Sequence, residues 1–594
     1  MIYPNVENIP QEKETINVFT GYEHTPTCPN SSFYDMKNIS TEEYPIIETR
    51  RRRGIVKTFT KFQGMIDKDG VVWVDNGKLY IDNTEVQGVS LDDKTDKIME
   101  KMGAYIVIFP DKVWYNTDSH ETGNIDASAE ITGSVSFTLC GADGTAITWH
   151  DASYYDSHTP QNGDYKMETV NGKTSLSVYS SNTGLWAVVA TTYMKIAATN
   201  IGKDFVEGDG VKVIVDLTNI TWDYAKNVFP NDEGSNKRSN TFTIKTRDDD
   251  YIIVPALLDE NKTISTTINV DRKAPDMSFI VECQNRLWGC KPDGHEIYCC
   301  KLGDVKNWNV FQGISTDSWA ATIGSDGVFT GAINYMGYPL FFKEDAIIRV
   351  SPSSIGAHST KETKCRGVEA GSEKSLVQLN EVLLYKSLDA VCLYDGSFPT
   401  EVSKQLGQEK YSQAIGGSNN NRYYISMKQG DVRTLFVYDI KTGLWAKEDN
   451  VNIVQFCRHA DELFFVANSS LYTVFGSHPF NSSNSEPPLG FTLESGKINY
   501  ELASKKYASR LITKNRVQNM NIRLTLGEEA YVSLYIKYDD KGWEHQWNVS
   551  GKETKTVLIP IRPHRCDHFS YMLQGRGNVK IYSITKTIVR GNDV

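Results

Sequence analysis

Four residues in one short stretch are of the types that bind zinc. Cys290, His295, Cys299 and Cys300 carry the thiol and imidazole groups that this metal prefers. Their spacing does not match a standard zinc site, and adjacent strand residues point to opposite faces, so Cys299 and Cys300 would diverge. We therefore expect no metal here. We interpret the thiols as core residues beside a turn histidine.

Two short stretches share a Thr-Gly-Leu-Trp sequence, at residues 182–186 and 441–445. Both resemble the Asp-box hairpin of sialidase propellers, in which a polar residue ties the turn and the tryptophan packs between blades. We therefore expect Trp445 to be a packing residue. A sialidase would also need an arginine triad and a tyrosine nucleophile, and no feature of the sequence indicates them.

Arg50, Arg51, Arg52 and Arg53 form the strongest basic run of the chain. Guanidinium groups suit bidentate pairing with carboxylates or phosphates. We expect these four residues to pair with carboxylates at a subunit interface. Two alternatives stay open: a solvated linker balanced by nearby glutamates, and contact with DNA phosphate.

Residues 248–250 are three consecutive aspartates, and Asp232 and Glu233 lie nearby. Carboxylates can bind calcium, but this run lacks the turn glycine and the spaced glutamate of an EF-hand loop, so we expect a solvated turn. The sequence contains no phosphate-binding glycine loop and no HExxH motif. We therefore expect no catalytic residues, no cofactor, no metal and no enzymatic activity.

The elements that position these residues are mostly short strands. Between residues 278 and 476, blocks of related sequence each contain short β-runs, a turn at Asp-Gly or Asn-Gly, and an aromatic residue. Repeats of about 40 residues with about four strands each are typical of a β-propeller. The helical candidate, residues 90–102, is short. We predict a mainly β fold, with a propeller of six to eight blades.

The block pattern stops after residue 118 and resumes near residue 278. A second β domain inserted into an exposed loop explains this interruption. The predicted domains are an N-terminal arm (residues 1–43), the first part of the propeller (44–118), an inserted β domain (119–275), the second part of the propeller (276–486) and a C-terminal β-sandwich-like domain (487–594).

The formal net charge is −11 and the pI is about 5.6, which argues against a general nucleic-acid binder. A protein surface rich in acidic residues would still let DNA move past it without binding, because it repels phosphate. The ten cysteines are scattered, which favours a reducing compartment over a disulfide framework. No apolar run is long enough for a signal peptide or a membrane span, so we expect no stable membrane insertion.

Several short motifs resemble those of virion tail propellers of tailed bacteriophages. The matching stretches are residues 44–45, 50–54, 284–289, 296–298, 307–308, 317–318, 329–331, 340–344 and 393–396. The resemblance covers about residues 44–118 and 278–450, and its plan is similar to that of the tail nozzle, or hub, proteins of short-tailed phages. The motifs are degenerate aromatic and glycine signatures. The inserted and C-terminal regions carry no matching motif.

This resemblance implies a structural virion protein that forms a ring of six copies below the portal. Such a ring would extend and close the DNA channel and carry other tail parts. Its partners would be copies of itself, the portal or adaptor proteins, other tail proteins, and the genomic DNA in transit. The protein would be made in the bacterial cytoplasm and would end in the virion tail. The alternative is a propeller binding module that recognises a host glycan or a partner protein, and a glycosidase is a third class.

Overall fold

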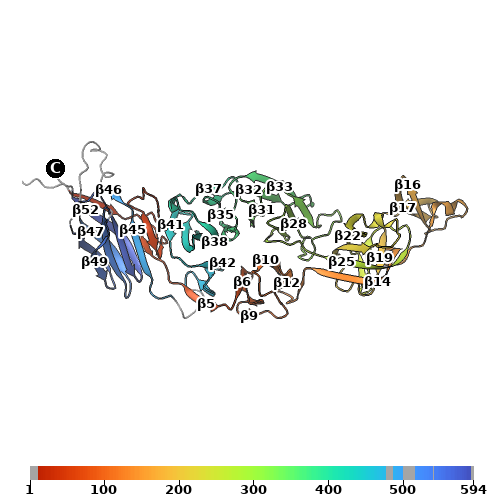
Figure 1. Cartoon of the computed structure of the whole chain (residues 1–594), viewed down its shortest axis with the longest axis horizontal. Helices are drawn as coiled ribbons and strands as arrows, with labels where there is room; N and C mark the ends of the chain where they lie inside the picture. The colour runs from red at the N-terminus through yellow and green to blue at the C-terminus, as the bar shows by residue number, and fades with distance from the viewer. Residues whose placement is uncertain (1–10, 477–485, 500–515, 540, 563, 590–594) are drawn as a thin grey trace, which may run out of the picture.

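The computed structural model describes residues 11–476, 486–499, 516–539, 541–562 and 564–589. The molecule is elongated and has three parts in a row: a β-sandwich at one end, a β-propeller in the middle, and an inserted β domain at the other end (Figure 1). The mainly β prediction with a propeller is confirmed. The helical segments are short: α1 (Ala225–Val228), η1 (Ala152–Asp156), η2 (Glu373–Ser375) and η3 (Lys404–Leu406).

The propeller has seven blades, and each blade is a four-stranded antiparallel sheet. Blades 1 and 2 precede the inserted domain. Blade 1 comprises β6 (Phe62–Asp67), β7 (Val71–Asp75), β8 (Lys78–Ile81) and β9 (Thr84–Glu85). Blade 2 comprises β10 (Ile98–Met102), β11 (Tyr105–Phe109), β12 (Val113–Asn116) and β13 (Thr122–Asn124). The helix expected at residues 90–102 is absent from these described residues because β10 pairs with β11 along its whole length.

Blades 3 to 6 follow the inserted domain in chain order. Blade 3 comprises β26 (Phe279–Glu282), β27 (Leu287–Cys290), β28 (Glu296–Cys299) and β29 (Trp319–Thr322). Blade 4 comprises β30 (Gly331–Tyr335), β31 (Tyr338–Lys343), β32 (Ala346–Ser351) and β33 (Ser359–Lys364). Blade 5 comprises β34 (Val377–Leu379), β35 (Val382–Lys386), β36 (Val391–Tyr394) and β37 (Thr400–Glu401). Blade 6 comprises β38 (Ser412–Asn419), β39 (Arg422–Gln429), β40 (Val432–Asp439) and β41 (Leu444–Lys447).

Blade 7 closes the ring with strands from distant parts of the chain. It comprises β42 (Ile453–His459), β43 (Glu462–Ala467), β44 (Ser470–Thr473) and β5 (Gly54–Thr58). β5 pairs antiparallel with β44, and Gly54 lies opposite Thr473. The first strand of the propeller therefore completes its last blade and joins the two ends of the ring.

Apolar side chains fill the interfaces between neighbouring blades. The middle strand β7 has all five residues buried, as expected for a strand that is covered on both faces. Six of the seven interfaces hold separate apolar clusters. The cluster between blades 5 and 6 is continuous with the core of the sandwich. The propeller and the sandwich therefore share one hydrophobic core.

The sandwich is built from both ends of the chain. One sheet contains β1 (Gln11–Ile16), β3 (Ile39–Ser40), β4 (Ile47–Thr49), β47 (Arg516–Leu526), β50 (Thr554–Pro560) and β52 (Val579–Val589). The other sheet contains β2 (Phe33–Lys37), β45 (Gly490–Ser495), β46 (Ile498–Asn499), β48 (Tyr531–Tyr538), β49 (Trp543–Ser550) and β51 (His568–Arg576).

The predicted N-terminal arm is therefore corrected. Residues 11–43 are not a separate extension, because β1 pairs with β52 over six residues, from Gln11 opposite Val589 to Ile16 opposite Ile584. Residues 1–10 of the predicted arm lie outside the described residues. β4 also belongs to the sandwich, so the propeller begins at β5 and not at residue 44.

The inserted domain lies between blades 2 and 3. Its main sheet has the order β21-β22-β20-β25-β14-β19-β24-β23. These strands are β14 (Ala127–Cys140), β19 (Tyr193–Ala197), β20 (Gly210–Asp216), β21 (Asn231–Gly234), β22 (Lys237–Thr243), β23 (Thr246–Asp248), β24 (Tyr251–Pro255) and β25 (Lys262–Arg272). A second sheet at the far end of the molecule contains β15 (Trp149–Asp151), β16 (Tyr165–Val170), β17 (Lys173–Ser180) and β18 (Leu185–Val188) (Figure 1).

Candidate functional site

Two segments of the chain cross between the sandwich and the propeller. Residues 50–53 lead from β4 to β5, and Glu486 lies on the segment that returns from blade 7 to β45. The backbone N–H of Arg53 donates to Glu486 Oε2 at 3.0 Å, and the N–H of Glu486 donates to the carbonyl of Arg53 at 3.0 Å. The two crossings are therefore bonded to each other, and we call this region the joint.

Arg53 is buried at the centre of the joint. Its Nη1 donates to Asp449 Oδ2 at 2.7 Å, and its Nη2 donates to Glu448 Oε2 at 2.7 Å. The guanidinium also lies over the ring of Phe465, 5.1 Å from the centroid. Arg53 thus connects the end of blade 6, where Glu448 and Asp449 follow β41, with the aromatic interior of blade 7.

Arg50 approaches the same carboxylates from the sandwich side. Its Nη1 donates to Glu486 Oε2 at 2.7 Å, and its Nη2 donates to Asp449 Oδ2 at 3.1 Å. Its Nε donates to Asn38 Oδ1 at 2.9 Å. Both arginines are buried, with 5% of Arg50 and 2% of Arg53 exposed. Two buried cations therefore face three carboxylates, which is the arrangement that compensates for the loss of hydration.

The pKa values in the joint reflect this pairing. Burial would lower the pKa of Arg53, but the charges of Asp449, Glu448 and Glu486 outweigh it and raise the pKa. Burial would raise the pKa of Asp449, but Arg53 and Arg50 overcome it and hold the pKa below its usual value. The charged forms of Arg53 and Asp449 are therefore both favoured.

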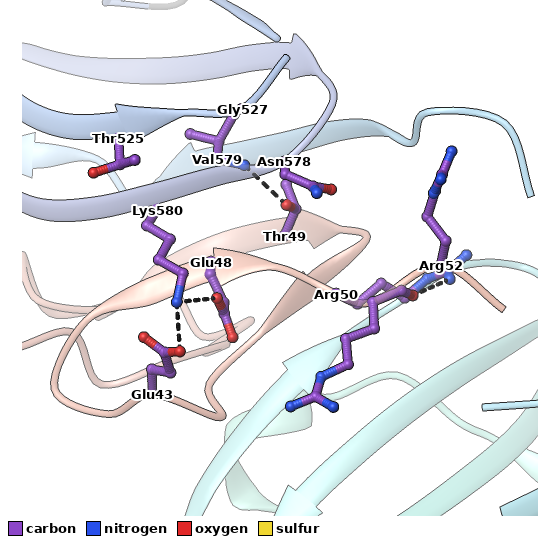
Figure 2. Close-up of a pocket in the computed structure, with 11 residues that line it drawn as sticks. Glu43, Glu48, Thr49, Arg50, Arg52, Thr525, Gly527, Asn578, Val579 and Lys580 are labelled. Carbon is purple, nitrogen blue, oxygen red and sulfur yellow. Dashed lines mark hydrogen bonds and ion pairs between the residues drawn. The ribbon is translucent and has the colours of Figure 1, made fainter. Parts of the chain in front are cut away.

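A cleft of about 420 Å³ lies beside the joint on the sandwich side (Figure 2). Lys580 on β52 crosses it to an ion pair with Glu43 and a second with Glu48 at 3.2 Å. The backbone N–H of Val579 donates to Thr49 Oγ1 at 3.1 Å. The lining residues are Glu43, Glu48, Thr49, Arg50, Arg51, Arg52, Thr525, Gly527, Asn578, Val579 and Lys580. Most of the charged side chains that line the cleft are already paired within the chain. The ion pairs of Lys580 thus contribute to the contact between β4 and β52.

The structure separates the four predicted interface arginines into two pairs. Arg50 and Arg53 bind carboxylates of their own chain, so the expected partners from a neighbouring subunit are wrong for these two residues. The reason is that the fold brings residues 448, 449 and 486 to them. Arg51 and Arg52 are exposed, and Arg51 pairs with Glu42 at 3.4 Å. For Arg51 and Arg52 the interface remains a prediction.

Sequence reasoning missed the carboxylate partners of the joint. Glu448 and Asp449 are an acidic pair just after the Trp445 strand, and Glu486 is an isolated acid in a polar stretch. The pairing spans almost 400 positions, and local sequence carries no signal for a contact at that separation. The run of four arginines was the one available clue.

The cysteine-rich stretch belongs to the core of blade 3. Cys290 and Cys299 pack in the cluster between blades 3 and 4, and Cys300 packs in the cluster between blades 2 and 3. His295 is exposed. Burial raises the pKa of Cys300 to about 12 and raises those of Cys290 and Cys299 as well. Within the described ranges, no cluster of histidine, cysteine or acidic residues is arranged to hold a metal ion.

The predicted acidic turns are engaged within the inserted domain. The carboxylate of Asp250 accepts the backbone N–H of Asn200 at 2.8 Å. Asp249 pairs with Arg247 at 3.1 Å, and Glu233 pairs with Lys212 at 2.7 Å. These contacts fix local turns and strand pairs.

The two Thr-Gly-Leu-Trp stretches differ in burial. Trp445 is fully buried, and its Nε1 donates to the carbonyl of Val402 at 2.7 Å, which confirms the predicted packing role. Trp186 lies in the far sheet of the inserted domain, where Tyr155 and Tyr179 contact its ring at centroid distances of 4.8 Å and 5.3 Å. Leu185, next to it, is 66% exposed. The stretch at residues 182–186 therefore lies at the surface of the molecule.

An aromatic stack lies near Trp186 on the same far sheet. Tyr154 is stacked between His150, at a centroid distance of 3.8 Å, and His158, at 3.9 Å. Exposed Val170 and Val188 lie on β16 and β18, the two strands that flank β17. We call this group the tip surface, and it combines aromatic rings with exposed apolar side chains at the end farthest from the sandwich (Figure 1).

No family model matches the chain, and no curated protein matches it. Solved structures that it resembles include an exo-beta-1,3-galactanase from Phanerochaete chrysosporium, with 9% identity, a TM-score of 0.21, and coverage of 52% of this chain and 95% of that chain. AztD from Citrobacter koseri has 10% identity, a TM-score of 0.26, and coverage of 73% of this chain and 100% of that chain. A GH43 glycoside hydrolase engineered in its active site has 7% identity and a TM-score of 0.18, and 52% of this chain covers 96% of that chain.

These structures correct the expectation that the chain has no enzymatic activity. Several of the resembling structures are glycoside hydrolases, so a fold of this kind does not exclude an enzyme. At these TM-scores and identities the likeness assigns no activity or substrate to this chain. An activity assay therefore belongs among the tests of its function.

Proposed function

We propose that the chain is a ring-forming structural subunit of the tail nozzle of a short-tailed bacteriophage. In this role several copies, six by analogy with the family it resembles, surround the channel below the portal. They extend and close that channel and carry other tail parts. The proposal rests on the sequence motifs at residues 44–54 and in blades 3 to 5, and on the construction of the joint.

The observation that supports it most is the fixed connection between the sandwich and the propeller. The two domains share one apolar core, two chain crossings join them, and Arg50 and Arg53 bind three carboxylates between them. A subunit that must hold its neighbours and a channel in register needs such a fixed geometry, because flexible linkers allow relative domain motion.

The distribution of parts along the molecule also suits a connecting subunit. The sandwich and the tip surface lie at opposite ends of the elongated chain, so each can meet a different partner (Figure 1). The net charge of −11 suits a wall past which DNA slides, because like charge prevents adhesion to phosphate. No helix within the described segments has the length and hydropathy to cross a bilayer.

The decisive test is imaging of the purified protein mixed with the portal protein of the same phage. Closed rings with a central channel, stacked on the portal, are the expected result. Native mass spectrometry would give the copy number, which we expect to be constant as the concentration is raised. A chain that stays monomeric with and without portal would contradict the proposal.

The tip surface favours one alternative, a propeller protein that binds a host glycan or a partner protein. Aromatic rings and exposed apolar side chains are typical of such contacts. Binding of the monomer to a glycan array, lost in Trp186→Ala, would support this reading. Hydrolysis of fluorogenic glycosides by the purified chain would instead indicate a glycosidase.

A further inference from the structure

The first hairpin of each blade, between its innermost and second strands, lies at the same rim of the propeller. Polar contacts join these hairpins from blade to blade, and we call the series the hairpin belt. Blades 3 and 4 are joined by Asn334 Nδ2 to the carbonyl of Glu282 at 2.9 Å, and blades 4 and 5 by Tyr335 Oη to the carbonyl of Glu381 at 2.7 Å. Blades 5 and 6 are joined by Asn380 Nδ2 to Asn421 Oδ1 at 3.2 Å, and blades 6 and 7 by Asn419 Nδ2 to the carbonyl of Asp461 at 2.7 Å.

The belt continues through charged groups between blades 7, 1 and 2. His459 Nδ1 lies 2.7 Å from Asp67 Oδ1, which joins blade 7 to blade 1. Lys101 Nζ donates to the carbonyl of Asp67 at 2.9 Å, which joins blade 1 to blade 2. Six of the seven junctions are therefore bonded at this rim.

The seventh junction, between blades 2 and 3, has two carboxylates instead. Glu100 on β10 and Glu282 at the end of β26 lie on the adjacent innermost strands of these blades, and the negative charge of Glu282 acts on Glu100. Glu282 accepts the backbone N–H of Asn285 in its own hairpin at 2.8 Å. In the part of the chain that the structure describes, no hydrogen bond or ion pair joins the first hairpins of blades 2 and 3.

The opposite end of the same junction, where β11 turns into β12 and the chain enters β26, is held by the base of the inserted domain. Arg272 binds the buried carboxylate of Asp209 at 2.5 Å and donates to the carbonyl of Ile125 in blade 2 at 3.1 Å. Asn307 of blade 3 donates to Asp209 at 3.0 Å. Lys112 of blade 2 pairs with Asp276, which leads into blade 3, at 2.8 Å. The junction is thus held at one end of the blades and unbonded at the rim that carries the first hairpins.

We propose that this rim between blades 2 and 3 is a proton-sensitive seam, which closes when Glu100 is protonated and loosens when Glu100 and Glu282 are both charged. Two like charges on adjacent strands repel each other in a partly buried site, and one proton removes that repulsion. Because the other end of the junction is held, loosening the rim changes the angle between the two blades and hence the direction of the inserted domain. The seam does not depend on the nozzle function.

The burial of Glu100 and the charged groups around it determine whether the seam strengthens or weakens as pH rises. Burial raises the pKa of Glu100 to about 7, the backbone N–H of Lys101 lowers it, and the charge of Glu282 raises it. On the opposite side of β10, Lys101 is directed to Asp67, which also binds His459. An unfolded Glu100 titrates at 4.5, so the folded chain retains the proton as pH rises from there to about 7. The seam is therefore strongest in acid and weakest above neutral pH.

Hydrogen exchange tests the seam directly on the intact chain. Protection of β10 and β26 would be compared at about pH 5.5 and about pH 8, after correction for the intrinsic exchange rate. We expect the opening equilibrium of these strands to rise about tenfold or more at the higher pH, since each unit of pKa shift corresponds to a factor of ten. Glu100→Gln should remove this rise, and Glu282→Gln should reduce it.

The comparison between variants carries the test, because it separates the two carboxylates of the seam from the other polar groups of the hairpin belt. Glu121→Gln, an exposed substitution before β13 of blade 2, should keep the wild-type response. A wild-type rise that persists in both Glu100→Gln and Glu282→Gln would overturn the proposal. So would an equal rise in β34 and β38, because the effect would then belong to the whole ring.

Discussion

The guanidinium of Arg53 lies 2.7 Å from the carboxylate of Asp449, although 396 positions separate the two residues in the chain. This contact ties the segment that enters blade 7 to the segment that leaves blade 6. Because Arg50 and Glu486 join the same group, it also fixes the sandwich to the propeller.

Replacing Arg53 by alanine should strongly destabilise the protein. The substitution leaves Glu448, Asp449 and Glu486 facing the single cation of Arg50, and removing one partner of a buried ion pair typically costs about 3–5 kcal/mol. Urea unfolding followed by tryptophan fluorescence would measure the loss. Arg52→Ala removes an exposed arginine from the same run and should change stability by less than about 0.5 kcal/mol. Equal effects of the two substitutions would show that the joint is not a stabilising contact.

The stability of the joint should decrease in acid. The pKa of Asp449 lies below its usual value of 3.8 in the folded chain, so its contribution is present above that value and is lost as pH falls through the folded pKa. The difference in unfolding free energy between wild type and Arg53→Ala should therefore shrink in strong acid. A difference that stays constant down to acid unfolding would argue against ion pairing as its source.

Trp445→Ala should cost about 3–5 kcal/mol, because it removes a fully buried indole and its bond to the Val402 carbonyl from the core shared by blade 6 and the sandwich. Thermal and urea unfolding would measure it. Trp547 on β49 is 45% exposed and provides the matched control, since its replacement by alanine should cost far less. A small loss at Trp445 would mean that the core repacks around the cavity.

The inserted domain should be removable without unfolding the propeller. Ala127 and Arg272 are opposite each other in the pairing of β14 with β25, so a short glycine-serine turn can join residues 126 and 273. We expect the shortened chain to keep a β-type circular dichroism spectrum and a cooperative melt. Failure to fold would show that the bonds of Asp209 to Arg272 and Asn307 are needed by blade 3.

Arg51 and Arg52 test the predicted subunit interface apart from stability. The double substitution Arg51→Ser, Arg52→Ser should leave the melting temperature nearly unchanged, because both side chains are exposed. Ring assembly with the portal should weaken if the two arginines meet carboxylates of a neighbour. Normal assembly combined with loss of packaged DNA from particles would make them a phosphate contact instead.

Some features were predictable because their signals are local. The blades repeat hairpins such as β7 and β8, in which Asn76 and Gly77 adopt the positive φ values that a tight turn requires. The packing role of Trp445 followed from its place after Gly443. The interruption of the repeats pointed to the inserted domain.

Other features depend on contacts that no local pattern encodes. β1 was interpreted as part of a polar arm because its sequence is mostly charged or polar. In the structure it pairs with β52 at the far end of the chain. The helix expected at residues 90–102 gave way to β10, because pairing with β11 outweighs weak local propensity. The four arginines were expected at one interface, but Arg50 and Arg53 are buried, whereas Arg51 and Arg52 are exposed.

The sequence by itself determined the strands, the hairpin turns and the kind of core that the blades bury, because these depend on residues a few positions apart. Tertiary structure alone decided that the ring has seven blades, that β5 closes it, and that the chain termini build one sandwich. It also decided that Arg50 and Arg53 face carboxylates of their own chain. The physical reason is that strand register and charge pairing over hundreds of residues are selected by the burial of the whole core, which no single segment contains.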